Sequence, residues 1–242
     1  MTVLVTRPDQ QGRELCQQLV GVGIPAIHHP LINIVANPNG NNLAHQLAEC
    51  DILIAISQHA VNFAQQLLSN ASSNWPAGII YLGVGQKTAH YLSKLSKQKV
   101  NYPLVGDSEH LLEIPELQDV DGKRVLILRG NGGRELIYQR LVQRQAKVEY
   151  CETYCREFIS FSAESAFPYW QQHDVTRIVI TSSEQLAFLV SQTPPIYQTW
   201  LFNLQLLVPS QRIVETAINL GFINALNVGS ASNSDLLATL QP

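Results

Sequence analysis

The chain carries few charged residues. Lys, Arg, Asp and Glu make up 14% of its 242 residues, compared with about 25% in a typical soluble domain, and the formal net charge is −3. A nucleic-acid surface requires clustered Lys and Arg, so this composition argues against one. No apolar run approaches the roughly 20 residues that cross a bilayer, and Met1 leads directly into the apolar segment VLV, without the pattern of an export signal. We therefore expect a cytoplasmic protein whose partners include neither nucleic acid nor a membrane.

Motifs for disulfide bonds and metal sites are also missing. The four cysteines have no C-x-x-C spacing, and a chain of this length builds an adequate core without disulfides, so we expect packed thiols. Among the seven histidines, His28 and His29 are adjacent on an extended segment and point to opposite faces. The others are isolated in the sequence, without the i, i+4 histidine pair and Glu of zinc-binding helices. The sequence therefore predicts no metal site.

Nucleotide-binding motifs are incomplete. GVG at Gly83 continues as QKT, and the glycines from Gly130 to Gly133 have no acidic residue at a suitable strand end about 20 positions later, so neither segment completes G-x-G-x-x-G. The motifs G-x-x-x-x-G-K-[ST] and G-x-S-x-G are absent, which argues against phosphoryl transfer and esterase chemistry. We expect no nucleotide cofactor.

The chain does contain an internal repeat. VLVTRP near the start returns as VLILRG at Val125, and VGDSEHLL at Val105 returns as VGSASNSDLL at Val228. Two further pairs of segments behave in the same way, and every segment returns 122 to 124 residues later. The repeat predicts two similar units of about 120 residues each. Junctions between such units are frequent sites for small molecules.

Within each half, short β-branched runs alternate with amphipathic stretches. This alternation predicts an α/β fold in which each unit has a parallel sheet flanked by helices on both faces. Ser57 is expected to cap one helix and Ser234 the last one, and Gly221 is expected to end the helix before it. The expected strands are 3–6, 26–34, 52–56, 79–84, 125–128, 147–161, 177–180 and 204–208, and the expected helices are 10–22, the segment after Ser57, 88–95, 108–112, 134–144, 183–190, 211–219 and 235–240.

Turns rich in hydrogen-bond donors follow most of the expected strands. In parallel α/β sheets, ligands bind beyond the carboxyl ends of the strands, where helix N termini present free N–H groups. A Ser or Thr in one such turn is explained by helix capping, but the whole set favours an anionic ligand. Six basic residues, which can bind carboxylates, lie in or beside these turns: Arg7, Lys87, Arg129, Arg134, Arg156 and Arg212.

Several motifs occur in a fixed order along the chain. They are VLVTRP, G-[IV]-x-A-x-x-x-P-L-I-x-I from Gly23, S-x-x-A-V from Ser57, V-G-x-x-T-A from Val84, ILRGNGGRELI from Ile127, and V-E-x-x-x-x-Y-x-R from Val148. By their order and spacing, the whole chain resembles the uroporphyrinogen-III synthase family. Two positions depart from the family pattern: Ile56, where Thr often precedes the Ser, and VPSQR at Val208, where Gly-Pro and a Thr are more usual.

The resemblance implies a chain path that the repeat alone does not give. Residues 1–34 and 159–242 would form one domain and residues 37–151 the other. Two extended linker strands, 31–36 and 152–159, would connect these two lobes, with the binding cleft between them. A two-stranded connection permits hinge closure and keeps the domains in register.

The resemblance also implies an activity. A cyclising hydro-lyase of haem biosynthesis converts hydroxymethylbilane, a linear tetrapyrrole with acetate and propionate side chains, into uroporphyrinogen III, with loss of water and inversion of ring D. Without an enzyme the chain closes without inversion, so the protein must select one conformation of a flexible polyanion. Orientation of this kind supplies up to roughly 7 to 11 kcal/mol. No cofactor is implied, and we expect a monomer with at most transient contact with the preceding enzyme of the pathway.

The site residues are carried over from the family motifs. Tyr154, at the Y-x-R position, is the expected catalytic proton donor to the departing hydroxyl, because a phenol stays protonated at neutral pH; aromatic packing beside the linker is the alternative interpretation. Backbone N–H groups are expected to matter as much as side chains, and Arg7 and Lys87 are the expected counter-charges. The expected substrate-binding residues are Arg7, Ser57, Gln86, Lys87, Arg129, Ser182, Ser183, Ser210 and Gln211.

Two other classes of protein stay open at this point. A non-catalytic two-domain protein that closes on a small polyanionic ligand would share the repeat, the linkers and the donor-rich turns, although the missing export signal argues against it. Paired receiver-like modules would need an acidic cluster for Mg²⁺ at the strand ends. Asp51 begins a strand and Asp121 precedes one, so that cluster is not indicated.

Overall fold

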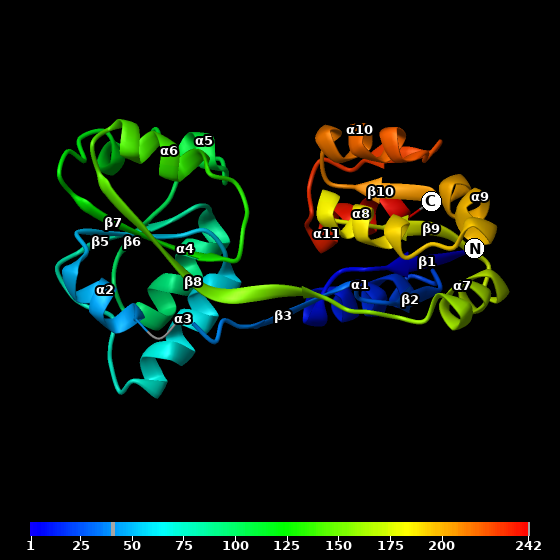
Figure 1. The fold of residues 1–242 in the computed structure, drawn as a ribbon, viewed down its shortest axis with the longest axis horizontal. Coiled ribbons are helices and arrows are strands. Elements are labelled where there is room, and N and C mark those ends of the chain that lie inside the picture. Colours follow the sequence, from blue (N-terminus) through cyan, green and yellow to red (C-terminus); the bar gives the residue numbers. More distant parts are fainter. Residues whose placement is uncertain (40–41, 242) are drawn as a thin grey trace. The chain divides into compact units, whose positions relative to one another are not determined.

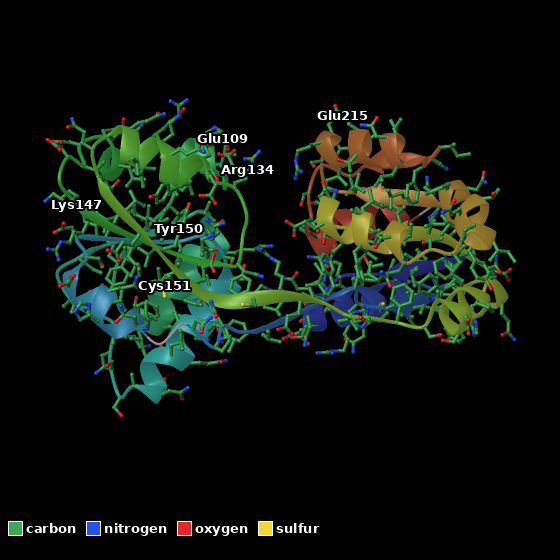
Figure 2. All side chains as sticks on the ribbon, viewed as in Figure 1. Glu109, Arg134, Lys147, Tyr150, Cys151 and Glu215 are labelled. Carbon is green, nitrogen blue, oxygen red and sulfur yellow. The ribbon has the colours of Figure 1, made fainter. Side chains whose placement is uncertain are left out.

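The computed structural model describes residues 1–39 and 42–241, which divide into two compact α/β units (Figure 1). Unit 1 combines Met1–Asn33 with the chain from Glu157 onwards, and unit 2 is Ile34–Arg156. Each unit has a sheet of mainly parallel strands with helices on both faces, so the predicted fold class is confirmed. Figure 2 adds the side chains that pack between these sheets and helices.

Unit 1 has a five-stranded sheet with the order β11-β10-β9-β1-β2, and all its neighbouring strands are parallel. In β1, Val3 and Val5 face one apolar cluster and Leu4 faces another, and all three are fully buried. A strand buried on both faces is written as a continuous apolar run, as in VLV. The strands are β1 (Thr2–Val5), β2 (Ala26–His28), β9 (Val175–Val179), β10 (Gln205–Val208) and β11 (Ala225–Asn227).

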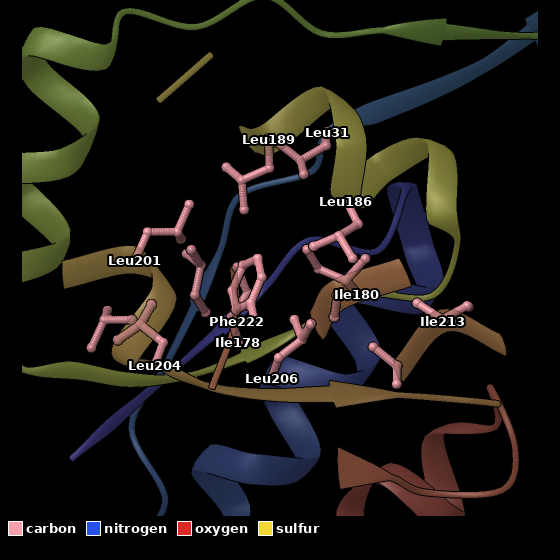
Figure 3. Packing of buried hydrophobic residues seen from close by; sticks show 14 of the residues in the cluster. Leu31, Ile178, Ile180, Leu186, Leu189, Leu201, Leu204, Leu206, Ile213 and Phe222 are labelled. Atoms are coloured by element: carbon pink, nitrogen blue, oxygen red, sulfur yellow. The ribbon is translucent and has the colours of Figure 1, made fainter. Parts of the chain in front are cut away.

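Within the described residues, six helices cover the unit 1 sheet. Two lie on one face: α1 (Asp9–Gly21) and α11 (Asn233–Leu240). The other face carries α7 (Ala163–Gln172), α8 (Ser183–Ser191), α9 (Pro195–Asn203) and α10 (Gln211–Leu220). Figure 3 shows the core on this face, where Ile178 and Leu206 from the sheet lie near Leu189, Leu201 and Phe222.

The sequence predicted the residue that ends α10 and the residue that caps α11. Gly221 follows α10 with φ of 111°, a left-handed conformation that favours glycine, as expected. The cap of α11 was predicted wrongly. Ser232, not Ser234, is extended and accepts a hydrogen bond from the backbone N–H of Asp235, so the helix begins two residues earlier.

Unit 2 has a six-stranded sheet with the order β3-β8-β7-β4-β5-β6. Strands β4 to β8 are parallel. The β3 and β8 segments run antiparallel, because the N–H of Asn37 donates to Thr153 O and the N–H of Ile159 donates to Leu31 O. The strands are β3 (Ile32–Ala36), β4 (Ile52–Ala55), β5 (Ile80–Gly83), β6 (Val100–Asn101), β7 (Arg124–Gly130) and β8 (Lys147–Phe158).

The helices of unit 2 also form two layers. One face of the sheet carries α2 (Leu43–Glu49), α3 (Gln58–Asn70) and α4 (Gln86–Ser96). The other carries α5 (Ser108–Leu111), the short 3₁₀ helix η1 (Pro115–Leu117) and α6 (Leu136–Gln143). Among the described residues no disulfide joins the cysteines; Cys50 and Cys151 are buried, and Cys16 and Cys155 are half-buried.

Candidate functional site

In both units, helices begin where parallel strands end. In unit 2, α3 follows β4 and α4 follows β5, and in unit 1, α8 follows β9 and α10 follows β10. The strands of each set are parallel, so within each unit these helix N termini lie along one edge of the sheet. This is the edge at which open α/β sheets bind ligands.

These four helices begin with the same backbone geometry. Their N-cap residues, Ser57, Gly85, Ser182 and Ser210, have φ between −163° and −147° and ψ between 152° and 169°. Ser182 and Ser210 each stand 125 residues after their counterparts in unit 2, so the repeat in the sequence extends to the geometry of the caps. The helix dipole and the unpaired N–H groups make such ends favourable for anions.

The four helices differ in whether the side chain of the cap residue accepts a hydrogen bond from a free N–H group of the first turn. Ser57 Oγ accepts from the N–H of Ala60 at 3.1 Å, and Ser182 Oγ accepts from the N–H of Gln185 at 3.2 Å. Gly85 and Ser210 do not cap their helices with a side chain. The first turns of α4 and α10 therefore keep N–H groups that a carboxylate can bind.

The other turn residues expected to bind substrate lie beside these caps. Gln86, Lys87 and Gln211 are exposed, whereas Ser183 is half-buried. The guanidinium of Arg212 donates to Ser183 Oγ at 3.1 Å. These positions supply both backbone and side-chain donors at the helix N termini of the two units.

Tyr154 lies in the interior of unit 2, with 1% of its surface exposed. It pairs with Gly130 of β7, where an added Cβ would come within 2.4 Å of the phenol ring, and the ring stacks against Phe63 with centroids 6.0 Å apart. Its hydroxyl lies 3.0 Å from Arg156 Nη2 and 3.3 Å from Ser57 Oγ. Three residues singled out in the sequence thus meet at one point of the sheet edge.

Arg129 is also buried, with 2% of its surface exposed. Its guanidinium donates to Glu135 Oε1 at 2.8 Å and lies 4.2 Å from the ring centre of Tyr150, whose hydroxyl donates to Glu135 Oε2 at 2.6 Å. The hydrogen bond from Tyr150, followed by that from Arg129, lowers the pKa of Glu135. Burial and the Glu135 carboxylate raise the pKa of Tyr150.

A pocket of about 180 Å³ opens beside this group, at the carboxyl ends of β4, β5 and β7. Arg134 at its rim contacts both carboxylate oxygens of Glu109, at 3.1 and 3.3 Å (Figure 2). The pocket has an apolar wall and a polar rim; its lining residues are Ile56, Val84, Ile127, Ile137, Ser108, Arg129, Arg134 and Tyr150.

Arg7 lies just beyond the end of β1 in unit 1 and is 6% exposed. Its guanidinium donates to two amide oxygens, Asn233 Oδ1 and Gln11 Oε1, and its buried Nε has no hydrogen-bond partner in the described part of the chain. Burial lowers the pKa of Arg7. A buried cation bonded to neutral groups leaves a positive potential at this strand end.

Sequence reasoning missed the partners of these cations. Glu135 belongs to the ILRGNGGRELI motif, and its place after the glycines was the only signal that it could reach Arg129. Asn233 lies 226 residues from Arg7, and no local pattern connects them. No group of three potential metal-ligating side chains occurs in the described ranges, and none of the helices described there is long and apolar enough to span a membrane.

The sequence of this chain is similar to a known protein family and to several of its members. Residues 13–237 match the family model described as uroporphyrinogen-III synthase HemD. The chain belongs to the uroporphyrinogen-III synthase family. Within the family it is 44% identical to the uroporphyrinogen-III synthase of Escherichia coli (strain K12) and 41% identical to that of Salmonella typhimurium, with 100% of each chain covered.

Solved structures of the uroporphyrinogen-III synthase family have the same fold. A mutant enzyme from Thermus thermophilus matches with a TM-score of 0.66 at 15% identity, covering 99% of this chain and 97% of that one. The enzyme from Helicobacter pylori matches with a TM-score of 0.63 at 13% identity, covering 99% of both chains. The fold is therefore retained where most of the sequence has changed.

Proposed function

We propose that this protein is a lyase of porphyrin biosynthesis that closes hydroxymethylbilane to uroporphyrinogen III, with loss of water and inversion of ring D. The observation that carries the proposal is the 44% identity over the full length of a uroporphyrinogen-III synthase. A non-catalytic polyanion-binding protein was the alternative from the sequence, and membership of an enzyme family argues against it.

The substrate has several carboxylate groups that must be bound and a hydroxyl group that must leave as water. Its acetate and propionate groups need counter-dipoles, which we assign to the N termini of α4 and α10, to the turns at Ser57, Ser182 and Ser183, and to the exposed Gln86, Lys87 and Gln211. We propose that Arg7 and Arg129, which are both buried, provide a positive potential behind these turns that attracts the carboxylates. Fixing several carboxylates at once selects one conformation of a flexible chain, which is catalysis by orientation.

The leaving hydroxyl needs a proton, and Tyr154 is the proposed source. Its hydroxyl lies beside the Ser57 cap, with a guanidinium as its second neighbour. A positioned acid of this kind is typically worth about 10² to 10⁴ in rate. We expect Tyr154→Phe to slow formation of the inverted isomer by at least about tenfold, and unchanged turnover would remove the residue from the mechanism.

The test of the function is isomer analysis. Freshly prepared hydroxymethylbilane is supplied to the purified protein, the products are oxidised to porphyrins, and the two isomers are separated by chromatography. We expect the inverted isomer to predominate over the isomer that forms spontaneously. Predominance of the spontaneous isomer at all protein concentrations would favour binding without catalysis.

We also propose that the enzyme needs no cofactor and acts as a cytoplasmic monomer, with at most transient contact with the enzyme that supplies its substrate. Carboxylate binding and proton donation by side chains and backbone account for the reaction without a bound metal. Activity that survives dialysis against a chelator, and a single 26.9 kDa species in sedimentation, are the expected results.

A further inference from the structure

The surroundings of Tyr154 constrain how a proton can leave it. The residue is 1% exposed, and its neighbours Gly130, Phe63, Ser57 and His59, whose ring centre lies 5.9 Å from that of the phenol, all belong to unit 2. Ser57, by contrast, is half-buried and begins α3 at the sheet edge. A ligand at that edge meets the serine hydroxyl before the phenol.

The donors and acceptors around the two hydroxyl groups fix a direction. A guanidinium only donates, so the Tyr154 oxygen accepts from Arg156 at 3.0 Å. A backbone N–H only donates, so Ser57 Oγ accepts from Ala60 at 3.1 Å. The remaining contact joins the two oxygens at 3.3 Å. Because a phenol is a stronger acid than an alcohol, the phenol is the donor in this contact. The proton of Ser57 then points away from Tyr154, toward the ligand side.

We propose that Ser57 protonates the leaving hydroxyl of the substrate and that Tyr154 then transfers its own proton to Ser57, while Arg156 positions the phenol. We call this pair of transfers the relay. This inference rests on the proposed function. It makes Ser57 the catalytic residue that touches the substrate, whereas Tyr154 and Arg156 act through it. It also makes Ser57 different from the other turn serines, whose hydroxyls we assign only to binding or capping.

The transfers balance as follows. The substrate hydroxyl takes the Ser57 proton, the C–O bond breaks with its electron pair on oxygen, and water leaves. Ser57 takes the phenolic proton of Tyr154, and the phenolate is stabilised by the hydrogen bond from Arg156. The bilane is left as a cation stabilised by the pyrrole nitrogen. Inversion of ring D requires two further changes: the cation bonds to the ring D α-carbon that already carries the chain, and the bond from that carbon to the chain breaks. The freed methylene carbon then bonds to the other α-carbon of ring D, which loses its proton, and this proton returns through Ser57 to Tyr154.

Arg156 is held in place by Asn131 as well as by Tyr154. Its N–H donates to Asn131 Oδ1 at 2.7 Å, and Nη1 donates to Asn131 O at 3.3 Å. The N–H of Asn131 in turn donates to Tyr154 O at 3.0 Å. The glycine-rich turn after β7 therefore fixes the guanidinium and the tyrosine backbone together, as a positioning group requires.

A double-mutant cycle tests the relay. Ser57→Ala, Tyr154→Phe and the double variant are compared for kcat and KM of inverted-isomer formation. We expect each single change to lower kcat at least about tenfold with KM within about twofold, and the double variant to be no slower than the slower single one. Losses that multiply, or wild-type kcat in Ser57→Ala, would overturn the relay.

Three controls separate the relay from structural damage. Ser57→Thr keeps the hydroxyl and should retain kcat, whereas Ser57→Gly removes the hydroxyl but preserves much of the cap, because glycine costs only a few tenths of a kcal/mol there. A fall in kcat for Ser57→Gly with retention in Ser57→Thr supports the relay, and equal kcat in both refutes it. Ser232→Ala removes a matched serine cap from α11 and should leave kcat unchanged.

Arg156→Gln provides the last arm. Alone, this substitution should lower kcat. Added to Tyr154→Phe, it should cause no further loss, because no phenolate forms there, and an equal loss in both backgrounds would contradict the assigned role. The proposed function is checked first with the wild-type protein. Absence of the inverted isomer there would sink the function itself, whereas failure of the cycle with an active wild type sinks only the relay.

Discussion

Single residues in this protein are positioned by very close contacts. Gly130 stands opposite Tyr154 in the β7–β8 pair, and the phenol ring occupies the space that a Cβ at residue 130 would need. The glycine is required here for space, because the conflict is with a packed ring and not with a flexible chain end. The position of the tyrosine is thus set by the neighbouring strand.

Gly130→Ala should therefore displace the Tyr154 ring. We expect a thermal unfolding midpoint lower by several degrees, as overpacking costs about 1 to 3 kcal/mol, together with a loss of inverted-isomer formation. Gly21→Ala is the matched control, because a Cβ at that helical position meets no atom within 4 Å. A Gly130→Ala protein as stable and as active as Gly21→Ala would contradict the packing argument.

Glu135 gives a pH-dependent prediction. Its pKa in the folded protein is lowered by Tyr150 and Arg129, below the value of about 4.3 of a free Glu. The carboxylate therefore stabilises the fold at neutral pH, and this contribution is lost as the pH falls through the folded pKa. We expect the thermal unfolding midpoint of Glu135→Gln to be lower than that of the wild type at pH 7, and the difference between the two midpoints to shrink below about pH 4. A difference that is constant with pH, followed by calorimetry, would exclude the ion pair as its cause.

The sequence identified many of these residues but not their partners. Tyr154, Ser57 and Arg156 could be singled out from local motifs, because each lies at a strand end or in a family pattern. The hydrogen bonds of Arg7 to Asn233 and of Arg129 to Glu135 depend on how strands align and where a loop turns. Such contacts follow from tertiary packing, which no periodicity records.

At the scale of helices and strands, the repeat is expressed most clearly at helix starts. Ser57 and Ser182 adopt the same extended backbone and the same side-chain cap, as local sequence rules predict. The missed elements include α2, which is short, α7, which contains Pro168, α9, which is apolar on several sides, and the brief edge strands β6 and β11. These form because the adjacent sheet or core is already present.

Ser183 allows a clean test of backbone binding. It is the first residue of α8, where proline is tolerated and removes only an N–H group. We expect Ser183→Pro to raise KM about tenfold or more, the equivalent of one hydrogen bond to a carboxylate, and Ser183→Ala to have a small effect. Both variants lose the bond from Arg212, so their comparison isolates the backbone donor. Equal KM values would argue that this N–H does not bind substrate.

The molecule as a whole consists of two units with very different chain paths. Unit 2 is one continuous segment, whereas unit 1 is assembled from both ends of the chain. In the unit 1 sheet, β1 lies between β9 and β2, so the N-terminal strand is internal to a sheet built mainly from the C-terminal third. The stability of unit 1 therefore depends on a pairing between distant segments.

Fragments should reflect this difference. A chain of residues 34–156 should fold cooperatively, while residues 157–242 alone should not, because β9 would lose its parallel partner β1. The N–H of Ile159 lies 2.9 Å from Leu31 O, so joining residue 33 to residue 157 through a short glycine-rich turn should restore a folded unit 1. Circular dichroism and amide exchange of the three chains measure this; a folded 157–242 fragment would contradict the central role of β1.

The place of β1 also has a consequence for biosynthesis. Strand β1 can pair early with β2, but its second partner, β9, emerges from the ribosome more than 170 residues after β1, since Thr6 bonds to Val179 across 173 positions. At about 5 to 20 residues per second this delay lasts roughly ten to thirty seconds. During that time the edge of VLV that will pair with β9 stays unpaired on the nascent chain, while the middle of the polypeptide completes its own sheet. Unit 1 is therefore the part of the protein that most needs chaperone protection during translation.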